Sequence, residues 1–386
     1  MCKGKPIYLD YNATTPCAPE VLDRMIPFFG VACGNPSSPH RMGRDASRAV
    51  EAAREQVAAA IGSDASEIIF TSGATESNWL CLFGCVQGAA SERTRMLVGA
   101  AEHKSILANR EVLEQRGITV EEIPVNGIGV IRAEVLATQL RSDVVLVSVQ
   151  AANNEIGTVQ PIAEIARLAH RAGSLVHCDA AQAVGKIPFD VCSAGVDLAS
   201  LSAHKIHGPK GVGAMFVRRG LSRSRLLPPI RGGGQEGGFR SGTLNVPGVV
   251  GMGVAFEVAC SRLRGDADRA LALRDALERD LVAGIPGSWI NGQGRSRLPG
   301  TTSLTVPGLP ADVIVAGVSP VCISSGSACT SGAVGPSHVL LAMGMRREDA
   351  ECTVRISLGR YTTSAEVKAA AKVIVQSVCE LRSQLA

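Results

Sequence analysis

Short apolar stretches alternate with amphipathic stretches over the first two thirds of the chain. The apolar stretches are typical of strands and lie near residues 68–71, 96–99, 118–123, 144–149, 175–178 and 198–201. The stretch at 144–149 is rich in β-branched residues, which is typical of a strand covered on both faces. Between them, apolar residues recur at three- and four-residue spacing and predict helices; these lie near residues 46–60, from 75, and at 105–115, 133–140 and 162–171. The alternation predicts an α/β fold with a mostly parallel, doubly wound central sheet flanked by helices.

The pattern changes after a glycine-rich stretch at residues 232–242. A long helix is predicted at about residues 249–282, followed by shorter strands and helices and a final amphipathic helix from Ala365. A chain of 386 residues exceeds the size at which a single core keeps growing. We therefore expect a large domain at residues 16–258 and a smaller α+β domain formed by residues 1–15 and 259–386.

Composition excludes several classes of partner. The net charge is only +4 and no basic run of five or more occurs, which argues against direct binding of nucleic acid. No apolar run reaches the ~18 residues that span a membrane, and the N-terminus does not resemble a signal peptide. The 12 cysteines form neither a C-x-x-C pair nor a cluster with zinc spacing, so we expect a reduced, cytoplasmic protein without a metal site. Cys81 and Cys85 are expected to be buried.

Lys205 is the first candidate for chemistry, because it follows the predicted buried strand at residues 196–201. Burial lowers the pKa of a lysine and leaves a neutral, nucleophilic amine, as a Schiff base with pyridoxal phosphate requires. The alternative is a solvated lysine in a loop before Gly208-Pro209. A phosphate cradle and a partner for the ring nitrogen would favour the first interpretation.

Two segments supply such groups. Residues 71–78 join a strand to a helix whose free N–H groups and small hydroxyl side chains suit a phosphate, although Ser72 or Thr75 could simply cap the helix. Asp179 ends a strand and could pair with a protonated pyridine nitrogen, or cap a helix at residues 180–184. Gln182 could contact the same ring.

Further polar residues follow other strands. His103 could stack on the cofactor or move a proton, or serve only as a structural hydrogen-bonding group. The amides of residues 153–157 could line the same edge or form a turn. Arg355 should project away from Val354 and Ile356, where its guanidinium could bind a carboxylate with two hydrogen bonds or form a structural ion pair.

Cys329 lies among small residues at 323–332, which predicts an exposed, mobile loop. A thiol on such a loop can act as a nucleophile, and an incidental surface cysteine is the alternative. The glycine-rich stretch lacks the strand-to-helix setting of a dinucleotide site, so we exclude that site and expect a loop that contributes to a neighbouring subunit.

Together these residues resemble the NifS/IscS-type cysteine desulfurases, which are class-V aminotransferases with the fold of type I pyridoxal-phosphate enzymes. The resemblance runs from Ile7–Thr15 to Arg360–Thr362, and the Ser-Ser-Gly-Ser-Ala-Cys-Thr-Ser segment around Cys329 is similar to the long-loop subgroup. It implies a sulfurtransferase that removes sulfur from L-cysteine, giving L-alanine and a persulfide on Cys329. Selenocysteine lyase, an aminotransferase and a non-catalytic sulfur-transfer scaffold remain alternatives.

The resemblance also implies roles for individual residues. Lys205 would bind the cofactor and, with His103 and Cys329, act in catalysis. The remaining implied cofactor contacts are Ala74, Thr75, Asn154, Asp179, Gln182, Ser202, His204 and Thr243, and the implied substrate contacts are Arg355, Asn35 and Asn154. Thr243 would reach the phosphate in the partner of a homodimer. The sulfur would pass to an acceptor or iron–sulfur scaffold protein, and Cys329 could bind an iron–sulfur cluster transiently.

Overall fold

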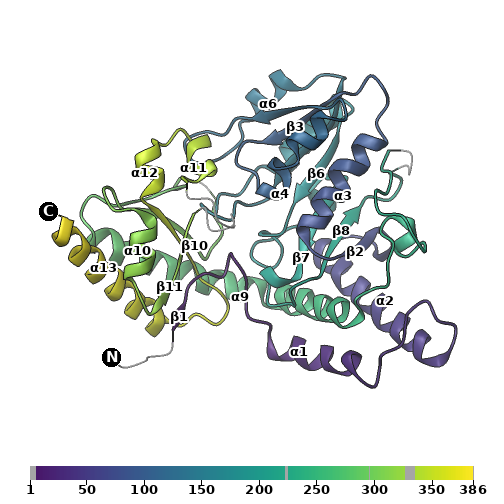
Figure 1. Ribbon diagram of the computed structural model, residues 1–386, viewed down its shortest axis with the longest axis horizontal. Coiled ribbons are helices and arrows are strands. Elements are labelled where there is room, and N and C mark those ends of the chain that lie inside the picture. The colour runs from purple at the N-terminus through teal and green to yellow at the C-terminus, as the bar shows by residue number, and fades with distance from the viewer. Residues whose placement is uncertain (1–5, 222–224, 295, 327–334, 386) are drawn as a thin grey trace.

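The computed structural model describes residues 6–221, 225–294, 296–326 and 335–385. Two sheet-containing parts lie side by side, and the long helix α9 (Val246–Gly284) runs from one to the other (Figure 1). The larger part contains a seven-stranded sheet, and the smaller part contains a four-stranded sheet and a two-stranded sheet.

The seven strands have the order β2-β8-β7-β6-β5-β3-β4. Their bounds are β2 Ile68–Thr71, β3 Arg95–Gly99, β4 Thr119–Ile123, β5 Val144–Gln150, β6 Leu175–Asp179, β7 Leu198–Ser202 and β8 Gly213–Val217. Among these strands β8 alone runs antiparallel to its neighbours. The predicted mostly parallel sheet is therefore confirmed, whereas β8, which inserts between β7 and β2, was not predicted.

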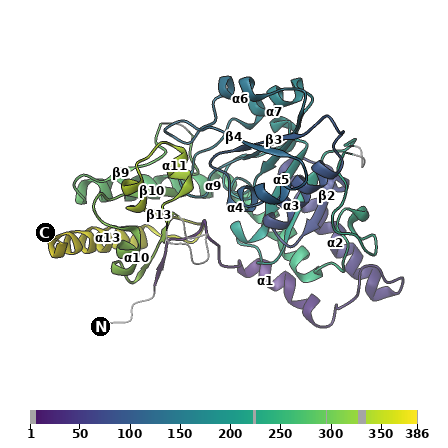
Figure 2. The ribbon, with the colours of Figure 1, turned by 45° about the horizontal axis from the view of Figure 1, so that its top comes forward.

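Helices cover both faces of this sheet. One face packs against α1 (Pro19–Met25), α2 (Arg41–Ile61), α6 (Ala133–Gln139), α7 (Ile162–Arg171) and the first half of α9. The other packs against α3 (Ala74–Gln87), α4 (Lys104–Leu107) and α5 (Arg110–Glu114). Figure 2 shows α6 and α7 together on one side. Because strand side chains alternate, Ile68 and Phe70 join one core and Ile69 the other. The burial predicted for Cys81 and Cys85 is confirmed.

One helix prediction was wrong, and a helix considered as an alternative is not formed. The single helix predicted at residues 105–115 is two short helices, α4 and α5. The side chain of Asn109 donates to the carbonyl oxygen of Ser105 (2.7 Å), so it replaces a backbone partner where α4 ends. Residues 180–187 form successive turns rather than a helix. The other short helix in this part is α8 (Val191–Ala194).

The predicted long helix is confirmed as α9, which starts at Asn245, whose side-chain oxygen accepts from the N–H of Gly248. Among the described helices it is the one long and apolar enough to cross a membrane, but 56% of its apolar window is buried inside the protein. Packing against α1 and α2 explains this apolarity. The second half of α9 packs against the C-terminal helix α13 (Ser364–Leu385), which confirms the helix predicted from Ala365.

The smaller part is built around an antiparallel sheet of order β12-β13-β10-β9. Its strands are β9 Trp289–Ile290, β10 Thr301–Thr305, β12 Ser324–Ser325 and β13 Thr353–Ser357, with β1 Ile7–Tyr8 paired to β11 Val321–Cys322. Helices α10 (Ala311–Gly317), α11 (His338–Ala342) and α12 (Arg347–Glu351) complete it. The N-terminal strand thus lies with the C-terminal third of the chain. The predicted domain limit at residue 258 falls within α9 and stays a prediction.

Candidate active site

A cavity of about 420 Å³ opens where the parallel strands of the large sheet end. Three strand ends supply its wall: Gln150 ends β5, Asp179 ends β6 and Ser202 ends β7. The carboxyl ends of parallel strands are where open α/β sheets bind ligands. The predicted site residues that line the cavity are Ala74, Thr75, His103, Asn154, Asp179, Gln182, Ser202, His204 and Lys205.

Lys205 lies in a short 3₁₀ turn directly after β7. Its Nζ donates to the backbone oxygens of Asn12 (2.8 Å) and Ala13 (2.7 Å). The amine is therefore held at the cavity wall by the N-terminal segment, rather than extending from a solvated loop. The sequence analysis assigned no role to Asn12.

The N-terminus of α3 is the anion cradle of this cavity. Gly73 is the N-cap and offers no side chain to the helix, so the first N–H groups at Ala74 and Thr75 remain for a ligand. Close approach of β8 requires glycine at position 213, because a Cβ there would lie 2.6 Å from the Cα of Gly73. Helix capping by Ser72 or Thr75, the alternative from the sequence, is not the arrangement observed.

His204 faces the same cavity and interacts through Nδ1 with Thr14 Oγ1 at 3.1 Å. Burial, reinforced by the charges of Lys205 and Lys210, lowers the pKa of His204 to about 4. The imidazole is thus neutral near pH 7 and can offer a hydrogen bond without adding charge.

Asp179 is buried and its carboxylate is held on both oxygens. Oδ2 accepts from Asn78 Nδ2 (2.8 Å) and Oδ1 accepts from the N–H of Ala181 (3.0 Å). Because residues 180–187 are not helical, Asp179 is not a helix cap. The sequence analysis assigned no role to Asn78, although it lies one helical turn after Ala74 and therefore on the same face of α3.

His103 forms the structural hydrogen bond that the sequence left open and also lies at the cavity. Its Nδ1 accepts from the N–H of Ser105 (3.1 Å) and so caps α4, and the residue also lines the cavity. Asn78 Nδ2 donates to Ser105 Oγ (2.8 Å), so the segment that carries His103 is tied to the partner of Asp179.

His177 lies in the sheet beneath this wall. It shares hydrogen bonds of 2.9 Å with Ser148 Oγ on β5 and with Ser200 Oγ on β7. Complete burial lowers the pKa of His177 to about 4, so the ring is neutral and links three neighbouring strands.

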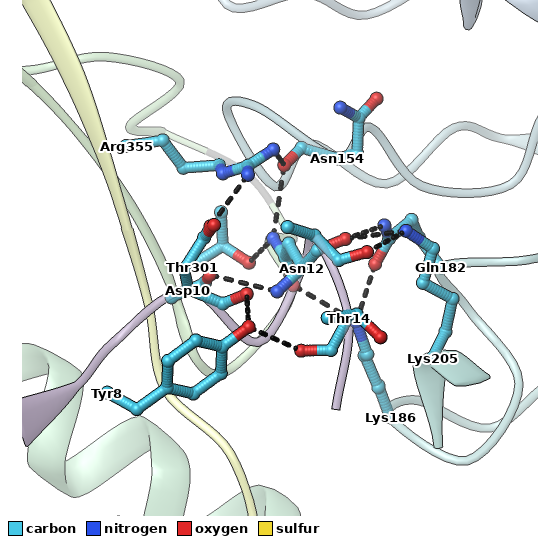
Figure 3. Close-up of polar contacts among 12 residues, drawn as sticks. Tyr8, Asp10, Asn12, Thr14, Asn154, Gln182, Lys186, Lys205, Thr301 and Arg355 are labelled. Carbon is cyan, nitrogen blue, oxygen red and sulfur yellow. Dashed lines mark hydrogen bonds and ion pairs between the residues drawn. The ribbon is translucent and has the colours of Figure 1, made fainter. Parts of the chain in front are cut away.

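Arg355 does not line the cavity but lies behind Asn154, which does (Figure 3). Its side chain is 1% exposed, and Nη2 donates to Asp10 Oδ1 (2.7 Å) while Nη1 donates to the Asn154 backbone oxygen (3.3 Å). Nε has no hydrogen-bond partner among the described residues. The structural ion pair considered from the sequence is present, and it leaves one donor unused.

Two predicted site residues are not brought into the cavity. Asn35 and Thr243 are exposed and lie outside the cavity lining. Cys329 lies outside the described residues. Within the ranges that the structure describes, no group of three or more His, Cys, Asp or Glu side chains is placed to hold a metal ion.

The arrangement suits one kind of cofactor. An amine at Lys205, a buried carboxylate at Asp179 and an uncapped helix N-terminus at Ala74 share one cavity. The amine can react with an aldehyde, the carboxylate can pair with a basic ring nitrogen, and the helix N-terminus can bind a phosphate. The cavity also falls within the range of small-molecule sites, roughly 300–1,000 Å³.

Comparisons with known proteins agree with this chemistry. The model of the family "Aminotransferase class-V" matches residues 7–370. The chain is 46% identical over 378 residues to the cysteine desulfurase IscS of Anaeromyxobacter sp. (strain Fw109-5), covering 98% of this chain and 93% of that protein.

Solved structures are similar over almost the whole chain. A NifS-like protein superposes with a TM-score of 0.91 at 38% identity, covering 97% of this chain and 100% of the other. The structure described as SspA in complex with cysteine gives a TM-score of 0.81 at 36% identity, covering 92% and 99%.

Proposed function

The chain belongs to the class-V aminotransferase family and is a cysteine desulfurase that uses pyridoxal phosphate, and we propose that Lys205 and Cys329 divide its chemistry. Lys205 would hold the cofactor and move protons, and Cys329 would receive the sulfur. The observation that carries the first half is the meeting of Lys205, Asp179 and the α3 N-terminus in one cavity.

The bound cofactor supplies a ring that withdraws electrons from the substrate carbon next to the amino group. Lys205 Nζ removes the proton from this carbon. Asp179 keeps the ring nitrogen protonated, since its carboxylate is oriented by Asn78 and Ala181. His103 lies in the same wall, where it can stack on the ring and assist proton transfer.

The phosphate would bind at the α3 N-terminus. The N–H groups of Ala74 and Thr75, the hydroxyl of Ser202 and the imidazole of His204 line that side of the cavity. Asn154 and Gln182 would contact the ring or its phenolic oxygen.

Arg355 would bind the substrate carboxylate. The support is its unused Nε and its position directly behind Asn154. Because Asp10 already occupies Nη2, the incoming carboxylate would share the guanidinium with it. Asn35 is proposed to assist, with the substrate lying between the two residues.

Cys329 would attack the substrate sulfur. The S–S bond of the persulfide forms as the C–S bond of cysteine breaks, and the carbon keeps the electron pair and takes a proton to give alanine. Gly326 supports this placement, because its Cα packs beside Glu155, which follows Asn154 in the chain.

We further propose a homodimer in which Thr243 reaches the phosphate of the partner subunit. Two observations support it: Thr243 is exposed away from its own cavity, and an apolar patch lies exposed over α1 and the start of α2. The patch consists of Leu22, Ile26, Phe29, Val31 and Met42. Apolar patches of this kind are typical of protein interfaces.

The sulfur would pass from Cys329 to an acceptor protein in the cytoplasm, and iron–sulfur cluster assembly is the proposed destination. The IscS name of the relatives supports this destination. A cluster would be held at Cys329 only during transfer.

The test replaces Cys329 with serine in the cofactor-loaded enzyme. Alanine and sulfide formation from cysteine should be lost while the visible absorbance of the cofactor is unchanged, because the cofactor contacts lie elsewhere. Cys379→Ser on the exposed face of α13 is the matched control and should keep the parent activity. Parent-like turnover in Cys329→Ser would overturn the assignment.

A further inference from the structure

Lys186 is a second lysine close to Lys205, and no role has been assigned to it so far. It does not line the cofactor cavity; it lines a small cavity of about 60 Å³ that also contacts Lys205. Its Nζ donates to Gln182 Oε1 (2.5 Å) and to Asn12 Oδ1 (3.0 Å) (Figure 3). The turns at residues 180–187 make this possible, since they bring positions four apart onto one side.

These two hydrogen bonds fix the orientation of two side-chain amides. With their oxygens turned toward Lys186, the amides must present their NH₂ groups elsewhere. Gln182 Nε2 donates to the Asn12 backbone oxygen (3.0 Å), and Asn12 Nδ2 donates to Thr301 Oγ1 (2.8 Å) and to the Asn154 backbone oxygen (3.1 Å).

Each amide donates to a backbone oxygen that also accepts from Lys205 or from Arg355. The Asn12 backbone oxygen that accepts from Gln182 also accepts from Lys205 Nζ. The Asn154 backbone oxygen that accepts from Asn12 also accepts from Arg355 Nη1. Lys186 therefore contacts both amides whose N–H groups reach these two backbone oxygens. One oxygen is shared with Lys205 and the other with Arg355.

The surroundings of Lys186 favour the neutral form of its amine. Burial, together with the nearby charges of Lys205 and Arg355, holds the pKa of Lys186 well below its usual value. A neutral amine has two N–H donors, and the two oxygens of Gln182 and Asn12 use both.

We propose that Lys186 is a positioning residue for Lys205. It locks the amides of Gln182 and Asn12 into the orientation that directs their N–H groups to the backbone oxygens of Asn12 and Asn154, and these oxygens also accept from Lys205 and Arg355. This proposal rests on the proposed role of Lys205 as the cofactor-binding lysine. Lys186 itself touches neither cofactor nor substrate.

The test is the pH midpoint of the visible absorbance change in the cofactor-loaded enzyme. Lys186→Met removes the donor that orients the Gln182 amide. The Gln182 N–H then no longer competes for the Asn12 backbone oxygen, and this oxygen holds the protonated form of the Lys205 nitrogen more strongly. The midpoint should rise by about half a pH unit or more. Lys372→Met on the exposed face of α13 is the matched control and should leave the midpoint unchanged. A parent midpoint in Lys186→Met would overturn the proposal.

The route through Gln182 is tested by a double-mutant cycle. In a Gln182→Leu background, Lys186→Met should shift the midpoint by clearly less than it does in the parent, because the amide it orients is gone. Fully additive shifts would overturn this route. Lys186→Gln, which keeps an N–H donor, should give a smaller rise than Lys186→Met.

Further variants separate a failure of the role of Lys205 from a failure of the role of Lys186. If Lys186→Met does not fold, Lys186→Ala carries the same test, and a parent midpoint there overturns the proposal. Lys205→Ala should abolish the lysine-linked visible band. If the band survived in Lys205→Ala, the role of Lys205 would be overturned, whereas an unchanged midpoint in the Lys186 variants overturns the positioning role alone.

Discussion

The carboxyl edge of the large sheet and the joint between the two sheets are built in different ways. At the edge, functional side chains lie at or just beyond strand ends: Asp179 ends β6, and Lys205 lies in the short turn that follows β7. The joint, which we define as Asn12, Asn154, Lys186, Thr301 and Arg355, joins five separate parts of the chain through amide and backbone groups.

The two regions also differ in how they treat charge. At the edge, the carboxylate of Asp179 and the uncapped N-terminus of α3 face an open cavity, where they can bind a ligand. At the joint, the guanidinium of Arg355 is already paired with Asp10 and Lys186 is enclosed by oxygens. In the proposed function the edge would supply the cofactor chemistry, and the joint would hold the substrate-binding group in position relative to it.

The largest expected effect comes from the edge. Asp179→Ala should lower kcat roughly 10³-fold, because the ring would lose the carboxylate that keeps its nitrogen protonated. Steady-state alanine formation measures it. Asp179→Asn keeps the shape and can still accept from Ala181, so a comparable loss would identify charge as the cause. An Asn variant as active as the parent would contradict the assignment and reduce the contrast between the two regions.

The joint should respond mainly in substrate binding. Arg355→Ala should raise KM for cysteine roughly 10- to 100-fold, as expected for a lost hydrogen bond between charged groups. Arg355→Lys should lie between the two, since lysine cannot bind a carboxylate through two parallel donors. Asp10→Asn, which releases the guanidinium, should not raise KM. A KM unchanged in Arg355→Ala would show that the joint is structural only.

The smallest expected effect is a pH dependence of the free energy of unfolding, caused by His177 in the sheet next to the cavity wall. The pKa of His177 is about 4 in the folded chain, against about 6.5 when unfolded. The unfolded chain therefore gains a proton first as the pH falls, and stability is lost between about pH 6.5 and pH 4. His177 alone should cost about 2 kcal/mol at pH 5, measured by urea unfolding. His177→Gln should show a shallower loss over this interval; an equal slope would contradict the cause.

Residues at the ends of predicted strands were found from the sequence because strand ends are local features. Short, mostly apolar stretches located β6 and β7, and the polar residue at the end of each stands at the edge. Strand β8 was missed, since its five residues carry no alternating pattern and it lies buried between two other strands.

The joint could not be predicted in the same way. The sequence analysis assigned no role to Asn12 or Lys186, and nothing local to either indicates that they meet. Asn78 is an intermediate case, because its spacing from Ala74 placed it on the correct face of α3 without identifying Asp179 as its partner.

The sequence by itself determined the sheet, its mostly parallel direction and the order of candidate groups along its edge. Hydrophobic periodicity and strand ends are local features that consecutive residues define. Only the tertiary structure decided which amide faces which amine, and that Arg355 lies behind Asn154 rather than in the cavity. Those choices depend on hydrogen bonds between residues more than a hundred positions apart. Their geometry exists only once both sheets have packed against α9.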